Sequence, residues 1–241
     1  MRTARHPGAW AALAAETLAR FGWPLIHQRT SRPVVRLRVH PLRRAVIVRA
    51  RLEDHGRAAR LIAAHAGEIA QRIAALPPPR PLVDGARLPW ADGDILLRHD
   101  PDAPRAGRRE GDRLVIGGGS AGFGVRAARA LRREAERELA GLVESCAGRL
   151  GVRVGAVRVK ETVSRWGSAS PAGVIALQWR LGFAPQMVRR YVAAHEAAHL
   201  VHPHHGPAFW RTVELLGVDP PSARGWLRTH GPALFAIGAS W

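Results

Sequence analysis

Hydrophobic residues in the first part of the chain predict two short strands followed by a helix. Apolar side chains alternate or cluster as they do in strands at residues 34–39 and 45–50, and Pro41 with the basic residues after it forms the turn. Residues 55–76 then carry apolar side chains at helical spacing, namely Leu61, Ile62, Ile69, Ile73 and Leu76. We expect one helix there, ended by the prolines at 77–79.

The middle of the chain predicts two further strands, at residues 94–98 and 113–117, on either side of a polar and mobile loop at 100–112. The segment 117–124 reads Gly-Gly-Gly-Ser-Ala-Gly-Phe-Gly. Because glycine leaves the backbone more freedom than any other residue, this segment is predicted to be the most flexible of the chain. We therefore place a domain boundary in it.

The last part of the chain is predicted to be mostly helical. A long helix at 125–150 has an apolar stripe and ends before Gly151, and the stripe consists of Leu131, Leu139, Leu142, Val143, Cys146 and Leu150. Shorter elements follow, which are strands at 152–160 and 173–177 and helices at 186–202 and 207–216. Residues 220–241 are too weakly patterned to assign, and the sequence contains no evident internal repeat.

Composition indicates a globular protein without a membrane span. The chain has 241 residues, of which 46% are hydrophobic, and no apolar run approaches the roughly 20 residues that a spanning helix needs. The apolar stretch at 8–15 is similar to a secretory signal, but Glu16 and Arg20 interrupt it. Cys146 is the only cysteine, which excludes an intrachain disulfide and a cysteine-based zinc site. We expect a cytoplasmic protein.

The formal net charge of +18 raises the question of a nucleic-acid partner, because clustered basic residues displace counterions from phosphates. Lys160 is the only lysine among 37 basic residues, and the chain is also rich in alanine, glycine and proline. Coding bias accounts for such a composition equally well. The arginines are also scattered along the chain. Charge alone therefore leaves contact with nucleic acid open.

The candidate chemistry lies in the helix predicted at 186–202. His195-Glu196-Ala197-Ala198-His199 has the pattern H-E-x-x-H. Imidazoles four residues apart lie on one helical face and can bind one ion, while Glu196 lies beside that ion as a general base. Five of the 12 histidines fall between His195 and His205. The pattern favours a catalytic metal site over a set of solvated histidines.

A catalytic zinc site needs a third protein ligand and one open position. His202 lies on the same helical face but roughly 10 Å further along the axis than His195. His204 and His205 follow Pro203, where the chain can turn back towards the metal. Glu214 on the next predicted helix is another chemically reasonable ligand. The residues alone leave these alternatives open.

Several sequence blocks occur around this motif in a specific order. They are Ser-Arg-Trp-Gly-Ser at 164–168, Gly-Val-Ile-Ala-Leu-Gln-Trp-Arg-Leu at 173–181, and the stretch from His195 to Trp210 that ends in Phe-Trp. In these blocks the chain resembles the YgjP-like metallopeptidase family, relatives of the SprT-type zincins, over residues 31–227. The family pattern has R-W-G-S-C, then H-E-L-x-H-L, then a histidine six residues on. The resemblance implies that His195, His199 and His205 are the metal ligands.

The chain departs from the family pattern at several positions. Ala169 stands in place of cysteine, and Ala176 and Gln178 stand where asparagine is usual. Ala197 replaces the leucine after the glutamate, and Gly206 replaces a common serine. These changes remove neither a metal ligand nor the base. They put in doubt only the part that those polar side chains play in substrate contact.

Arg165 and Trp166 are candidate substrate-binding residues. They precede Gly167, where a turn would bring them to the active-site helix. An arginine there could stabilise an oxyanion or bind phosphate, and the tryptophan could form a wall of the cleft. The alternative is that Trp166 packs in the core and Arg165 is solvated. Phe209, Trp210 and Tyr191 are expected to pack under the metal site.

These residues predict a zinc-dependent hydrolase with one Zn²⁺ per chain, although cobalt, nickel and manganese also suit such a site. Zinc lowers the pKa of its bound water towards about 7, and Glu196 takes the proton as the hydroxide attacks. The resemblance implies a metallopeptidase acting on a peptide. A metal-dependent nucleoside triphosphate pyrophosphatase and a nucleic-acid-associated protein with a structural zinc are the alternatives.

The expected fold is α/β (α+β) in two parts. After an N-terminal extension at 1–30, residues 31–120 are expected to form a β-rich subdomain with one long helix. Residues 121–241 are expected to form a small zincin-type domain, in which a twisted sheet backs the helix that carries His195 and His199.

Overall fold

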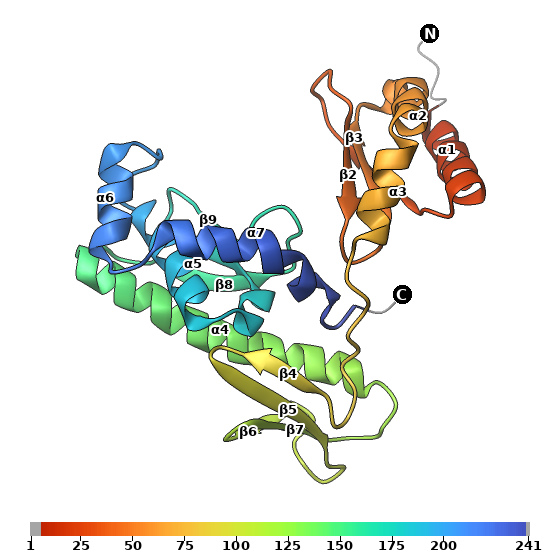
Figure 1. The fold of residues 1–241 in the computed structure, drawn as a ribbon. Helices are drawn as coiled ribbons and strands as arrows, with labels where there is room; N and C mark the ends of the chain where they lie inside the picture. Colours follow the sequence, from red (N-terminus) through yellow and green to blue (C-terminus); the bar gives the residue numbers. More distant parts are fainter. Residues whose placement is uncertain (1–5, 240–241) are drawn as a thin grey trace. The chain divides into compact units, whose positions relative to one another are not determined.

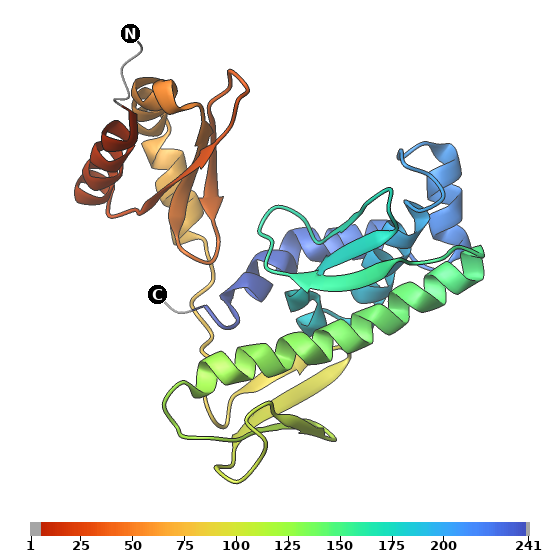
Figure 2. The same cartoon turned by 180° about the vertical axis from the view of Figure 1, so that it is seen from behind.

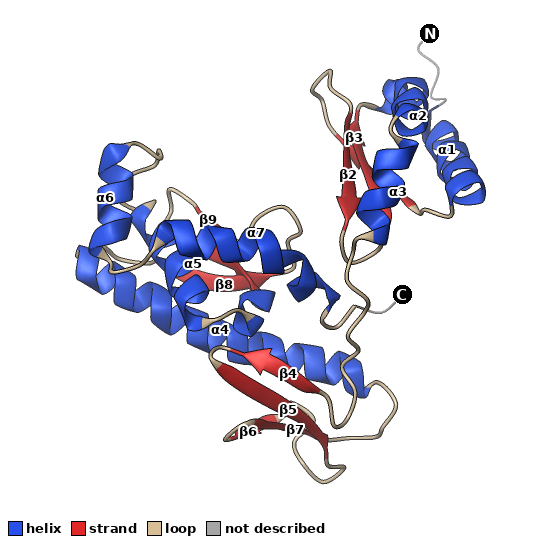
Figure 3. Ribbon diagram, in the orientation of Figure 1, coloured by secondary structure: helices blue, strands red, loops and turns tan. Residues whose placement is uncertain are grey.

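The computed structural model describes residues 6–239 and divides into two compact units (Figure 1). The first unit extends as far as Pro78, and the second runs from Pro79 to Gly238. Figure 3 shows that both units combine helices with small sheets, which confirms the predicted mixed α/β class. None of the helices in the described residues is long and apolar enough to cross a membrane.

The first unit packs a three-stranded sheet against helices. Its elements are, in chain order, α1 (His6–Phe21), β1 (Leu25–Arg29), β2 (Arg36–His40), β3 (Ala45–Ala50), the 3₁₀ helix η1 (Leu52–Asp54), α2 (His55–Ala64) and α3 (Ala66–Ala74). The central strand β3 pairs in parallel with β1 and antiparallel with β2. The predicted strand at 45–50 has the observed bounds, whereas the strand predicted at 34–39 covers Arg36–His40.

Two helices occupy the place of the single helix predicted at 55–76. The chain leaves the helical conformation at His65, where φ is −107° and ψ is 15°. This break lets Ile62 of α2 and Ile69 of α3 reach one apolar core, which also contains Val46 and Val48 of β3. The prediction of one helix was wrong because helical spacing alone does not reveal a one-residue change of direction.

The described part of the segment predicted as an N-terminal extension, residues 6–30, contributes α1 and β1 to this unit. Residues 1–5 lie outside the described part of the chain. The Trp10 side chain of α1 is buried, its Nε1 donates a hydrogen bond to the carbonyl of Leu52 (2.8 Å), and its ring stacks on His27 of β1. These contacts make α1 part of the core of the first unit.

The second unit begins with a four-stranded sheet in the order β4-β5-β7-β6. Its strands are β4 (Arg87–Trp90), β5 (Gly93–His99), β6 (Arg108–Glu110) and β7 (Arg113–Ile116), so that β6 lies inside the loop predicted at 100–112. Leu88, Ile95 and Leu114 of this sheet share one apolar core with Leu131 and Leu139 of the long helix α4 (Phe123–Leu150).

The glycine-rich segment 117–124 does not separate the two units. Arg126 of α4 folds back over it and donates hydrogen bonds to the carbonyls of Gly117, Gly119 and Ala121. The division lies instead in the proline run, between Pro78 and Pro79. The observed units therefore differ from the expected domains 31–120 and 121–241, because strands β4 to β7 bury their apolar face against α4 and belong to its core.

A second small sheet of this unit supports the candidate site. Its strands are β8 (Ala156–Lys160), β9 (Gly167–Ala169) and β10 (Val174–Gln178), in the order β8-β10-β9. The 3₁₀ helix η2 (Trp179–Phe183) and the helices α5 (Gln186–Ala198), α6 (Pro207–Leu215) and α7 (Pro220–Ala236) follow. Figure 2 shows α4 running along this sheet on one side and along the β4–β7 sheet on the other. The region 220–241, unassigned from its pattern, thus contains α7.

Candidate metal centre

Helix α5 presents the first two histidines of the site. Pro185 precedes the helix with an extended backbone, and Val188 and Val192 are buried in the core of the second unit. His195 lies in the last turn and His199 caps the helix, four residues on, so both rings lie on one side of it. The helix ends at Ala198, whereas the sequence predicted that it would continue to residue 202.

The early end of α5 allows the chain to bring His205 back to the first two histidines. His195, His199 and His205 each offer a ligand atom, and these atoms all lie within 4.8 Å of one another. The Nε2 atoms of His195 and His205 are 3.1 Å apart. Two nitrogens that bind one zinc at about 2.0–2.1 Å lie roughly 3.3 Å apart in tetrahedral geometry. The arrangement therefore has the size of a three-histidine metal site.

The protonation chemistry of the three rings suits a metal. Burial lowers the pKa of His195 to about 4, and the nearby His199 and His205 add to the effect. Burial also lowers the pKa of His199. Neutral imidazoles are the form that binds metal ions. Because Nε2 of His195 and Nε2 of His205 converge and all three side chains of the cluster are imidazoles, a divalent cation fits it.

Neighbouring histidines have other roles. Nδ1 of His199 bonds to the backbone carbonyl of His202 (3.1 Å), which leaves Nε2 of His199 for a metal. The ring of His202 contacts Oγ1 of Thr212 on α6 through Nε2 (3.1 Å). His202, His204 and Glu214 do not belong to the cluster that the described residues form. The structure thus brings together the three histidines that the family resemblance implied.

Glu196 lies beside the three histidines in a buried position. Glu196 is 5% exposed, and its side chain packs against Gly167 of β9. A Cβ atom at Gly167 would lie 2.4 Å from Oε1 of Glu196, so only glycine permits this approach. Burial raises the pKa of Glu196 to about 7, opposed by the charge of Arg165 and by a hydrogen bond from the backbone of Ala169. A buried carboxyl group with a pKa near neutrality is suited to proton transfer.

A cleft of about 700 Å³ opens in front of the histidines and Glu196. One wall is formed by residues 167–171, which include the whole of β9, and another by the segment from Leu200 to His205. Strand β9 is the edge of its sheet, since it pairs only with β10 among the described strands. Its other edge carries no strand among the described residues, and the backbone of Ala169 donates a hydrogen bond to Glu196.

Arg165 and Trp166, the two predicted substrate-binding residues, have different surroundings. The Arg165 side chain is exposed, close enough to Glu196 to affect its pKa. The Trp166 ring packs on Phe235 of α7 (5.1 Å between centroids), and a Cβ atom at Gly231 would lie 2.8 Å from it. Trp166 thus anchors its loop to α7 and also lines a second cavity next to Glu196.

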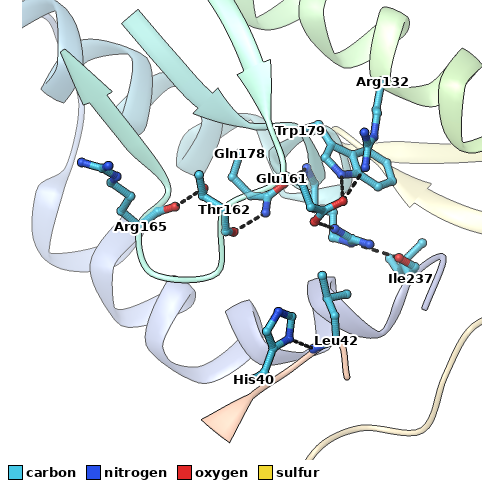
Figure 4. A network of polar contacts seen from close by, with 10 residues as sticks. His40, Leu42, Arg132, Glu161, Thr162, Arg165, Gln178, Trp179 and Ile237 are labelled. Atoms are coloured by element: carbon cyan, nitrogen blue, oxygen red, sulfur yellow. Dashed lines mark hydrogen bonds and ion pairs between the residues drawn. The ribbon is translucent and has the colours of Figure 1, made fainter. Parts of the chain in front are cut away.

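A polar network that the sequence did not indicate holds the loop before Arg165 (Figure 4). Glu161 accepts hydrogen bonds from Arg132, Trp179 and the buried Arg180, whose Nε also donates to the carbonyl of Ile237 (3.0 Å). In the same network Gln178 donates to the carbonyl of Thr162, and Thr162 donates to the carbonyl of Arg165 (2.8 Å). The network ties the loop to β10 and to the end of α7.

Comparisons with known proteins identify a family. The family model described as YgjP-like, metallopeptidase domain, matches residues 34–230. A solved structure, the metallopeptidase zymogen abylysin of Pyrococcus abyssi, is similar with 24% identity and a TM-score of 0.34, over 39% of this chain and 92% of that one. No curated protein matches the chain.

Proposed function

The chain belongs to the YgjP-like metallopeptidase family, and we propose that it hydrolyses peptide bonds with one zinc ion bound to His195, His199 and His205 and with Glu196 as general base. Family membership makes it a metal-dependent hydrolase. The observation that carries the finer proposal is the convergence of three imidazoles next to one buried carboxylate.

The metal, when bound, would supply Lewis acidity, which makes water deprotonate near neutral pH and polarises the oxygen of the attacked group. His195, His199 and His205 would hold it. Glu196 would take the proton of the attacking water and pass it to the leaving group. Gly167 lets the carboxylate reach this position, and the hydrogen bond from Ala169 fixes its orientation.

The edge strand β9 favours a peptide as the substrate. An extended peptide can add to an exposed sheet edge through backbone hydrogen bonds, which bind any sequence of residues. Here that edge lines the same cleft as the histidines and Glu196. A peptide bound along β9 would therefore pass the reacting groups.

A nucleoside triphosphate is the second candidate substrate. The exposed Arg165 lies near Glu196, and a guanidinium group binds phosphate oxygens in a bidentate manner. A structural zinc in a nucleic-acid-associated protein has less support. It would need a fourth protein ligand, and His202 is engaged with Thr212.

A parallel screen tests the proposal. Zinc-loaded protein is incubated with unstructured peptides and with nucleoside triphosphates, and zinc-loaded Glu196→Gln serves as the blank. We expect peptide cleavage that falls about 10²–10⁴-fold in the variant, while its zinc content is unchanged. Cleavage of nucleotides and not peptides would contradict the proposed peptidase activity, but it would be consistent with a metal-dependent hydrolase. Equal rates for wild type and Glu196→Gln would exclude Glu196 as the base.

A further inference from the structure

A second cavity adjoins the cleft of the metal centre. It measures about 320 Å³ and shares Gly167, His195 and Glu196 with the cleft. Its other lining residues include two arginines from distant parts of the chain, Arg165 before β9 and Arg224 on α7. A substrate held at Glu196 would therefore lie next to a cavity that both arginines line.

The guanidinium group of Arg224 is fixed in place. Its Nε donates to the carbonyl of Pro220 (3.3 Å), and its Cζ lies 5.0 Å from the centroid of the Trp210 ring. That ring in turn stacks on His205, with centroids 5.8 Å apart. The Arg224 charge adds to the lowering of the pKa of His195 that burial causes, and it opposes the rise that burial causes in the pKa of Tyr191. Arg224 thus presents a positioned cation to the reacting centre.

Arg165 supplies the second cation. Its backbone carbonyl is held by Thr162, and Figure 4 shows its side chain extending away from the network that fixes the loop. Its charge acts on Glu196. Within the described residues, neither Arg165 nor Arg224 forms an ion pair with a carboxylate.

Several other arginines of the same unit pair with carboxylates. Arg132 and Arg180 pair with Glu161, and Arg109 and Arg189 pair with Glu138. Arg165 and Arg224 have no such partner among the described residues, and both line the cavity next to Glu196. Their terminal nitrogens are suited to bind a carboxylate or a phosphate group.

We propose that Arg165 and Arg224 form a subsite for an anionic group of the substrate, next to the bond that is cleaved. The subsite rests on the proposed function, because it places that group relative to Glu196. For a peptide the group is an acidic side chain or the terminal carboxylate, and for a nucleotide it is a phosphate. The cavity therefore selects acidic substrates over neutral ones.

Binding to zinc-loaded Glu196→Gln tests the subsite without requiring turnover. Three fluorescent probes are titrated: a peptide with glutamate at its centre, the same peptide with glutamine, and a nucleoside triphosphate. We expect the glutamate peptide to bind about tenfold more tightly than the glutamine peptide. Arg165→Ala and Arg224→Ala should each abolish this difference, and added salt should reduce it.

Arg228→Ala is the matched control, since Arg228 is an exposed arginine on the same helix outside the cavity. It should leave all affinities unchanged. Equal binding of the two peptides, together with triphosphate binding that is insensitive to Arg165→Ala and Arg224→Ala, would overturn the subsite. Arginine-dependent binding of the triphosphate alone would support the subsite while contradicting the peptide as substrate. Failure of hydrolysis with retained arginine-dependent binding would count against the proposed function only.

Discussion

The two units contain the same succession of elements around a sheet of the same strand order. In the first unit α1, β1, β2, β3, η1 and α2 follow one another, and in the second α4, β8, β9, β10, η2 and α5 do. In both sheets the third strand is central, parallel to the first and antiparallel to the second. Among the described residues only the second unit carries a cluster of metal-binding side chains. The scaffold alone therefore does not determine chemistry.

The edge strands show what separates the two sheets. Strand β2 of the first unit is Arg-Leu-Arg-Val-His, whereas β9 of the second is Gly-Ser-Ala. The small residues of β9, and Gly167 above all, let a helix side chain come within contact distance of the strand. The helix after the sheet also differs, since the last turn of α5 carries His195 and Glu196, whereas the last turn of α2 has neither histidine nor glutamate. The histidine cluster thus depends on side chains at the end of α5 and on His205, which lies after the shared elements.

Substitution of the metal ligands should have the largest effect, because it should remove the chemistry that distinguishes the second unit from the first. His199→Ala or His205→Ala should abolish retained zinc and reduce hydrolysis to background, because two imidazoles no longer enclose the ion. His202→Ala and His204→Ala are the controls and should keep full zinc. Elemental analysis of the purified variants decides. Full zinc in His205→Ala with loss in Glu214→Ala would reassign the third ligand.

Gly167→Ala sharpens the contrast between the edge strands. The added methyl group would displace the Glu196 carboxylate, and a displacement of about 1 Å can lower a rate roughly 10²-fold. Zinc content should remain unchanged. Gly148→Ala, at a helical position with open space around it, should have no effect on rate. An unaltered rate in Gly167→Ala would show that the close approach of β9 to α5 has no part in catalysis.

A core substitution in the first unit tests whether chemistry is confined to the second. Ile62 is 2% exposed in the core of the first unit, and Ile62→Ala should lower the stability of that unit by about 2–5 kcal/mol. Zinc binding should persist through the unfolding transition of the destabilised unit. Calorimetry gives the unfolding transition, and metal analysis of the same sample gives the zinc content. Zinc loss in step with the transition of the first unit would contradict the confinement of the metal site to the second unit.

The smallest effect concerns acid stability of the second unit. Burial opposes ionisation of Glu161, but Arg180, Trp179 and Arg132 together hold its pKa below the ordinary value of 4.5. The carboxylate therefore stabilises the fold above that value, and this contribution is lost as the pH falls through the lower pKa of the folded state. In Glu161→Gln the stability of the fold should depend less on pH in this window. Acid unfolding monitored by circular dichroism measures this dependence. Glu144→Gln on α4 is the control, and an identical acid profile for Glu161→Gln would refute the effect.

Local patterns of the sequence were sufficient for some elements and not for others. The strand at Ala45–Ala50 and the helices α4 and α6 follow from apolar periodicity and from Gly151 and Pro207 at their ends. The break at His65 and the helix α7 do not, because the first is a single backbone change and the second has Pro232 within it. The division between Pro78 and Pro79 differs from the boundary expected in the glycine-rich segment, and Arg126 holds that segment.

In the candidate site, too, local sequence patterns were sufficient for some residues and not for others. H-E-x-x-H identifies His195, Glu196 and His199 from spacing alone, whereas the choice of His205 over its neighbours required the family resemblance. Arg224 could not be found from the sequence, since it becomes part of the site through tertiary packing on Trp210. Glu161 and Gln178 likewise act through contacts between residues that are distant in sequence.

X-ray absorption at the metal edge of the zinc-loaded chain tests the central claim most directly, because it counts the imidazole nitrogens bound to the ion. The account predicts one zinc per chain with three imidazole ligands, the remaining coordination being light atoms that exchange when a competing small anion is added. Four imidazole ligands, or three that leave no exchangeable position, would mean a closed structural site and would contradict the proposed hydrolase.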